Sequence, residues 1–190
     1  MINKKLINIP NILSFYRLVA FPFILYCALY NLEKIFVILL ITNLITDILD
    51  GFIARRFNMQ TEFGARLDSI ADIGTYILAF VGVFTFKLED FTPHLISFFI
   101  FLGLFIFAEL LSVFKFGRLP SLHLYSSKIG GYIQGAFFFV LFAFGFNVYF
   151  YYFMVIFGIL SFTEHIIIQL IIPEMKSNSK GLYWVLKNRK

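Results

Sequence analysis

Long apolar runs separated by short polar connections give this chain its pattern. A run of about 18 to 25 mainly apolar residues is long enough for a helix to cross the hydrocarbon core of a bilayer. Six such runs are present, at residues 12–30, 35–53, 63–86, 93–114, 129–146 and 148–172. The pattern therefore predicts an all-α integral membrane protein with six transmembrane helices, in which consecutive spans are antiparallel.

The composition agrees with this prediction and excludes a soluble class. Hydrophobic residues make up 60% of the chain, charged residues 14%, and the mean hydropathy is +0.86. Because no polar stretch is long enough to form a soluble domain, we expect residues 1–190 to form a single membrane domain. The one cysteine, Cys27, lies in an apolar run and cannot form an intrachain disulfide, so we expect it to be a small buried hydrophobe.

Positive charge is distributed unequally between the two sides of the predicted bundle. Of the 16 Lys and Arg residues, all except Lys34 and Lys87 fall on the side that carries both termini. Cytoplasmic loops carry this excess, so we expect both termini to be cytoplasmic. The basic residues flank the spans, which indicates contact with anionic membrane lipid and no nucleic acid partner.

The segment before the first span carries apolar residues and two lysines, Lys4 and Lys5, and permits a short helix in the headgroup plane. We expect no cleaved signal peptide, because Arg17 interrupts the apolar run and no small-x-small site follows it. Pro10 and Asn11 suit the start of a helix. Two interpretations of Arg17 stay open, a snorkelling side chain and a site residue.

The most informative stretch is residues 47–72, which place four carboxylates on two predicted helices. Asp47 and Asp50 are three positions apart and Asp68 and Asp72 four, so each pair projects from one helix face. Residues 51–67 between them are few enough for the two pairs to face each other. Unpaired carboxylates would repel, so a positive charge must lie among them.

Ligands that are all oxygen favour a hard divalent cation, here Mg²⁺ or Mn²⁺. Three small residues, Gly51, Ala54 and Gly64, share the faces of the acids. Small residues at these positions allow close approach of a second helix or of a nucleotide.

These residues fill every fixed position of the pattern D-x-x-D-G-x-x-A-R-x8-G-x3-D-x3-D, the signature of the CDP-alcohol phosphotransferase (CDP-alcohol phosphatidyltransferase) family, which the chain therefore resembles. The filled positions are Asp47, Asp50, Gly51, Ala54, Arg55, Gly64, Asp68 and Asp72. The motif covers 26 residues, and the layout of spans around it is also similar to that family.

The resemblance implies an enzyme of phospholipid biosynthesis that transfers a phosphatidyl group from CDP-diacylglycerol to a polar alcohol and releases CMP. It implies that Asp47, Asp50, Asp68 and Asp72 hold a divalent metal and that Asp72 is also the catalytic base. It further implies that Gly51, Ala54, Arg55 and Gly64 bind the CDP group. A homodimer in the bacterial cytoplasmic (inner) membrane, with its active site facing the cytoplasm, is expected.

The acceptor is predicted to bind at residues 115–135, which bring Lys115, Arg118, His123 and Lys128 to the cytoplasmic side. Lys128, Ile129 and Gln134 resemble part of the G-K-I-K-T-x-x-Q run of phosphatidylglycerophosphate synthases, but Gly130 and Gly131 replace Lys-Thr. Glycerol 3-phosphate is the first expectation, with inositol, inositol phosphate and serine as alternatives. These cations also suit simple topology charges.

Three ionisable residues inside predicted spans have two open interpretations. Glu109, Glu164 and His165 either line the acceptor site or form hydrogen bonds across helices. A cation transporter is the distant alternative to an enzyme. A transporter predicts acids near the middle of the bilayer, whereas these acids cluster at one face.

Overall fold

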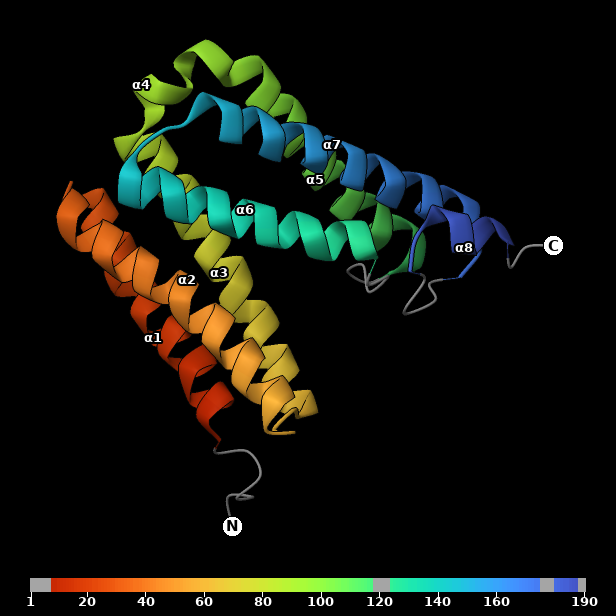
Figure 1. Cartoon of the computed structure of the whole chain (residues 1–190), viewed down its shortest axis with the longest axis horizontal. Coiled ribbons are helices and arrows are strands. Elements are labelled where there is room, and N and C mark those ends of the chain that lie inside the picture. The colour runs from red at the N-terminus through yellow and green to blue at the C-terminus, as the bar shows by residue number, and fades with distance from the viewer. Residues whose placement is uncertain (1–7, 118–123, 175–179, 188–190) are drawn as a thin grey trace. The chain divides into compact units, whose positions relative to one another are not determined.

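The computed structural model describes residues 8–117, 124–174 and 180–187, and every regular element in these ranges is a helix (Figure 1). Six of these helical segments are long and apolar enough to cross a membrane, which confirms the predicted class. The elements are α1 (Ile9–Leu29), α2 (Glu33–Arg56), α3 (Glu62–Phe86), α4 (Leu88–Phe91), the 3₁₀ helix η1 (Thr92–His94), α5 (Leu95–Phe116), α6 (Tyr125–Phe144), α7 (Val148–Ile171) and α8 (Leu182–Lys187).

Several helices begin earlier than the apolar runs predict, because their first turns are polar. Helix α1 begins at Ile9, where the side chain of Asn8 accepts a hydrogen bond from the Asn11 N–H and Pro10 occupies the first turn. Helix α6 begins at Tyr125 and includes Lys128 in its first turn. The segment proposed to lie in the headgroup plane falls largely on residues 1–7, which are outside the described ranges.

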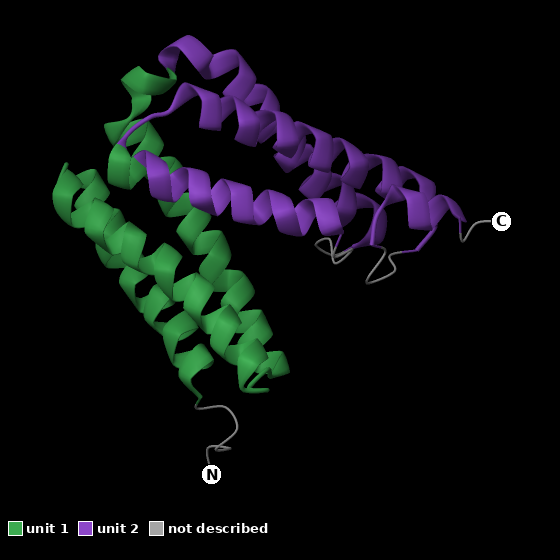
Figure 2. Cartoon of the chain, viewed as in Figure 1, with its two compact units in different colours: residues 1–91, 142–144 green, residues 92–141, 145–190 purple. Residues whose placement is uncertain are grey.

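The chain divides into two compact units, and the first contains residues 1–91 and 142–144 (Figure 2). In this unit α1 packs against both α2 and α3. Its core is apolar and includes Ile24, Leu40 and Leu78, which are fully buried. Cys27 is free and buried in the same core, as the sequence predicts.

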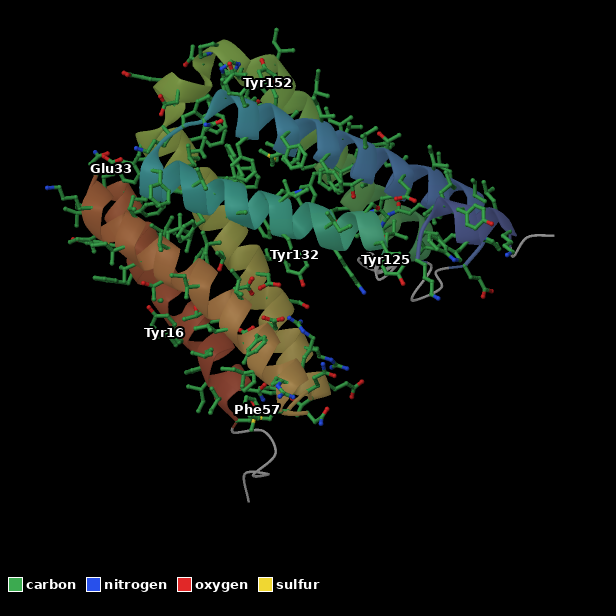
Figure 3. All side chains as sticks on the ribbon, in the orientation of Figure 1. Tyr16, Glu33, Phe57, Tyr125, Tyr132 and Tyr152 are labelled. Atoms are coloured by element: carbon green, nitrogen blue, oxygen red, sulfur yellow. The ribbon has the colours of Figure 1, made fainter. Side chains whose placement is uncertain are left out.

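The two ends of α2 carry different groups. Glu33 lies at its start and Phe57 directly follows its end (Figure 3). At the first end the Lys87 Nζ donates to Glu33 Oε1 at 2.8 Å. Asp47 lies 14 positions after Glu33, about 21 Å along the helix. The acidic motif is therefore remote from the Lys87 end, as predicted for this part of the chain.

The outer faces of these helices carry large apolar side chains. Ile38 is 65% exposed, Ile48 66% and Phe52 57%. Exposed residues of this kind along whole helices suit contact with lipid.

The second unit contains residues 92–141 and 145–190 (Figure 2). Helix α7 packs against α5, and α8 contacts α7. A cluster of Leu124, Ile168 and Ile172 is buried here, with Leu182 and Val185 of α8 packed against it. The short helix α8 is therefore attached to the end of α7 by an apolar contact.

Candidate active site

Polar side chains join the start of α1 to the connection between α2 and α3. The side-chain amide of Asn8 donates to the carbonyl of Met59 at 3.1 Å. Thr61 caps α3, because its Oγ1 accepts from the Gly64 N–H at 2.9 Å. The Asn11 amide reaches the same Thr61 oxygen at 3.5 Å. The first turns of α1 and α3 are thus fixed side by side.

Gly64 is required by this close approach. A Cβ atom built at this position would collide with Asn11 Oδ1 and lie 2.9 Å from Thr61 Oγ1. A larger residue would therefore displace the side chains of Asn11 and Thr61, whose contact joins the starts of α1 and α3.

The two predicted carboxylate pairs meet. Asp47 and Asp50 project from α2 and Asp68 and Asp72 from α3, all two to three turns from the connection between these helices. One ligand oxygen each from Asp47, Asp50 and Asp68 lies within 4.8 Å of the others. The sequence prediction that these side chains face one another is confirmed.

The positive charge among them is the guanidinium of Arg17, which comes from α1. Its Nη1 donates to Asp47 Oδ1 at 2.6 Å and to Asp72 Oδ1 at 2.7 Å. Its Nη2 donates to Asp50 Oδ2 at 2.7 Å and to Asp68 Oδ1 at 2.5 Å. The Arg17 side chain is fully buried. A buried arginine needs such partners, and here one side chain connects α1, α2 and α3.

The four aspartates differ in exposure. The Asp50 side chain is 4% exposed and also accepts a hydrogen bond from Ser14 Oγ at 3.0 Å. The Asp47, Asp68 and Asp72 side chains are 42%, 39% and 40% exposed. Asp50 therefore forms the inner wall of the cluster, and the other three can contact a bound molecule.

The donor set fits a hard divalent cation. All candidate ligand atoms are carboxylate oxygens, the type that Mg²⁺ and Mn²⁺ prefer. Four carboxylates against the one guanidinium leave three formal negative charges in the cluster. Added positive charge is thus electrostatically favourable here.

The residues predicted to bind CDP lie at the same end of the first unit. Arg55 is exposed on α2, and its guanidinium extends back along the helix over Gly51. A Cβ atom at Gly51 would lie 3.2 Å from Arg55 Nη1, so the glycine makes room for this side chain. Ala54, which directly precedes Arg55, is half-buried. Their binding of a nucleotide stays a prediction.

Of the four residues predicted to bind the acceptor, two can be located. Lys115 donates from Nζ to the carbonyls of Gln169 at 2.7 Å and Leu170 at 3.0 Å, at the end of α7. Lys128 is exposed in the first turn of α6. Arg118 and His123 lie outside the described residues.

The intramembrane Glu164 forms hydrogen bonds across helices, which is one of its two predicted interpretations. Its Oε2 accepts from Ser126 Oγ at 2.5 Å, and its Oε1 accepts from the Leu182 N–H at 2.8 Å. Glu109 is half-buried and His165 is buried.

The sequence left Arg17 open between a snorkelling side chain and a site residue, and it did not identify this arginine as the positive charge expected among the aspartates. A signal was present, because a charged residue two turns inside an apolar span needs a partner, and the four carboxylates were the only large source of opposite charge in the sequence. Ser14, one turn earlier on the same helix, contacts Asp50 and was also not identified.

Residues 7–167 match the protein family described as CDP-alcohol phosphatidyltransferase. The relative named CDP-diacylglycerol--glycerol-3-phosphate 3-phosphatidyltransferase from Aquifex aeolicus is 35% identical over 96 residues, which cover 50% of this chain and 53% of that protein. The protein of the same name from Salmonella typhimurium is 37% identical over 79 residues, covering 40% and 43%.

A more distant match is the fusion protein of a CMP-forming cardiolipin synthase and a mitochondrial hydrolase from Schizosaccharomyces pombe. It is 34% identical over 71 residues, which cover 37% of this chain and 12% of that protein. The chain spans about half the length of the bacterial relatives that it matches. No solved structure matches it.

Proposed function

We propose a function from the premise that this chain belongs to the CDP-alcohol phosphatidyltransferase family. It transfers the phosphatidyl group of CDP-diacylglycerol to glycerol 3-phosphate and releases CMP. The observation that supports this most strongly is the meeting of the four motif aspartates on α2 and α3. The names of the bacterial relatives support the choice of acceptor.

The reaction is a displacement at phosphorus. The acceptor hydroxyl oxygen forms a bond to the phosphorus that carries the diacylglycerol. The bond from this phosphorus to the bridging oxygen breaks, and the electron pair leaves with CMP. The hydroxyl proton passes to Asp72, which we assign as the general base. Its side chain is 40% exposed and Arg17 holds its Oδ1 at 2.7 Å, so it is both reachable and oriented.

Asp47, Asp50, Asp68 and Asp72 would hold the divalent cation, Mg²⁺ or Mn²⁺. When bound, such an ion neutralises charge that develops on the transferred phosphoryl group and on the leaving phosphate. Arg55 binds the pyrophosphate, because its exposed fork matches phosphate oxygens. Gly51, Ala54 and Gly64 complete the CDP site.

For the acceptor, we assign the phosphate of glycerol 3-phosphate to Lys128, Arg118 and His123. Lys115 would join them by exchanging its two carbonyl partners for phosphate oxygens. Inositol, inositol phosphate and serine are the alternative acceptors.

We place the protein in the bacterial cytoplasmic membrane as a single-domain homodimer, with the aspartates facing the cytoplasm. The excess of Lys and Arg on the side of the acidic motif supports this orientation. The bacterial relatives support the choice of membrane.

The test is an acceptor panel. The purified protein is incubated with CDP-diacylglycerol, Mg²⁺ or Mn²⁺, and glycerol 3-phosphate, inositol, inositol phosphate or serine, while CMP and the lipid product are measured. We expect CMP and a phosphatidylglycerophosphate product with glycerol 3-phosphate. CMP release with another alcohol, and not with glycerol 3-phosphate, would show that this other alcohol is the acceptor. Cation uptake into vesicles, with no CMP release from any mixture, would overturn the enzyme proposal.

A further inference from the structure

The guanidinium of Arg17 lies where a cation bound by the motif would lie. Each of the four aspartates directs one oxygen to it, at distances of 2.5 to 2.7 Å. Four of its five N–H groups are used in this way, and Nε has no hydrogen-bond partner among the described residues. Arg17 therefore serves as the counter-ion of the whole cluster.

A divalent cation and this guanidinium compete for the same oxygens. Mg²⁺ binds oxygen at about 2.1 Å and needs lone pairs directed at it. Three of the four oxygens engaged by Arg17 belong to Asp47, Asp50 and Asp68, the residues whose ligand atoms gather within 4.8 Å. Two positive centres bound to one set of oxygens would also repel each other.

The difference in burial among the aspartates sets the order in which an incoming ion can replace the contacts of Arg17. Asp50 is 4% exposed and also accepts a hydrogen bond from Ser14 of the same helix as Arg17, so an incoming ion reaches this carboxylate last. The side chains of Asp47, Asp68 and Asp72 are each about 40% exposed. An arriving cation meets these three carboxylates first.

We propose that Arg17 is an intrinsic cation that holds the four motif carboxylates together and yields their oxygens to a divalent cation, those of Asp47, Asp68 and Asp72 first. Arg17 thus sets the metal affinity of the site by competition. This inference rests on the proposed metal-dependent function.

The experiment compares the wild-type protein with Arg17→Met, which keeps an unbranched side chain and removes the charge. The metal-free proteins are purified in detergent and titrated with Mg²⁺ or Mn²⁺ by calorimetry, and thermal unfolding is recorded with and without the ion. Arg56→Met is the matched control, because it removes one positive charge from an exposed position near the end of α2.

For Arg17→Met we expect a lower metal-free Tm, because four carboxylates then repel one another, and a larger rise of Tm when the ion is added. If the cluster is open to metal in about one tenth of wild-type molecules, removing the competitor tightens the apparent Kd about tenfold. Arg56→Met should keep the wild-type Kd to within about twofold, because screening weakens the effect of an exposed charge.

If Arg17 only holds the aspartates in place, its removal would disorder the cluster, and Arg17→Met would bind the metal more weakly than the wild type. Unchanged or weaker binding by Arg17→Met would overturn the inference. If this variant does not fold without metal, Arg17→Lys replaces it. Lysine keeps the charge but lacks the planar fork, so we expect its affinity for the metal ion to lie between those of the wild type and the methionine variant. Metal binding by Arg17→Lys that is unchanged from wild type or weaker would overturn the inference.

The wild-type data separate this inference from the function on which it rests. Wild-type protein that binds the ion and releases CMP, while Arg17→Met binds no tighter, would remove the inference and leave the function intact. Wild-type protein that neither binds a divalent cation nor releases CMP would remove both.

Discussion

At the scale of single residues, the four aspartates share one arginine but have unequal access to a bound molecule. Asp50 is closed in by Arg17 and Ser14, whereas Asp72 combines an ion pair with a side chain that is 40% exposed. This difference makes Asp50 the least accessible of the four proposed metal ligands and leaves Asp72 accessible for its proposed role as the base.

Asp72→Asn tests the assignment of the base. The amide oxygen can still accept from Arg17, so we expect Tm to stay within about 3 °C of wild type, a change that corresponds to about 1 kcal/mol. Loss of general base catalysis should lower CMP release by about 10² to 10⁴. CMP release and thermal unfolding are measured on the same preparations. A wild-type rate would show that another group takes the proton.

Gly64→Ala tests the close approach of α1 and α3. The added methyl group would collide with Asn11 Oδ1, and overpacking of this kind costs about 1 to 3 kcal/mol. We expect a lower Tm, and partial recovery in the double variant Asn11→Ala/Gly64→Ala. Gly103→Ala is the matched control, because a Cβ there meets no atom within 4 Å. Equal effects at both glycines would contradict this interpretation.

The positions of the site side chains were predictable where they followed from helical spacing. The spacing of Asp47, Asp50, Asp68 and Asp72 predicted that two pairs would face each other, and they do. The partners of Arg17 were not predictable in the same way, because they lie 30 to 55 positions away along the chain. Contacts at such separation depend on how whole helices pack.

At the scale of elements, Glu164 connects three helices of the second unit. It accepts one hydrogen bond from Ser126 of α6 and one from the backbone of Leu182, the first residue of α8. The attachment of α8 thus combines this polar link with the apolar cluster around Ile168.

Glu164→Ala should loosen α8. The only tryptophan of the chain, Trp184, lies on this helix with its ring centroid 5.8 Å from that of Tyr125. We expect a shift of its fluorescence emission and greater quenching by a water-soluble quencher, because removal of two hydrogen bonds to a charged group costs about 1.5 to 3 kcal/mol each. Thr163→Ala, at an exposed position of α7 next to Glu164, is the control. Unchanged emission would show that the apolar contact alone holds α8.

Element types followed from the sequence more closely than element ends. The six apolar runs correspond to the six long helical segments, since span length is set by bilayer thickness. The start of α6 was placed too late, because its polar first turn carries no apolar signal, whereas Pro10 indicated the first turn of α1. Helices α4 and α8 are too short for any periodicity to indicate them.

At the scale of the whole molecule, orientation can be tested with the chain's own cysteine as background. Cys27 is fully buried, so a membrane-impermeant thiol reagent should not reach it. In intact bacterial cells we expect labelling of Lys34→Cys and not of Arg56→Cys, with both labelled after the membrane is opened. The reverse result would place the aspartates on the outer side and contradict the proposed orientation.

The sequence predicted one membrane domain because no polar linker interrupts the spans. The structure contains two compact units. The first boundary along the chain falls between Phe91 and Thr92, where a short helix is followed by a 3₁₀ turn, and residues 142–144 at the end of α6 belong again to the first unit. The six apolar runs do not indicate such a division, because helices of both units have similar hydropathy and the sequence does not show which helices pack together. The single domain and the homodimer stay predictions.

The position of Arg17 in α1 also has a consequence for biogenesis. Ribosomes make the chain from its N-terminal end, so the arginine enters the translocon before Asp47, Asp50, Asp68 and Asp72 have been synthesised. When α2 and α3 enter the membrane, one positive charge is therefore already present in α1 to pair with their carboxylates. These two helices can form their first contacts with α1 before any metal ion binds.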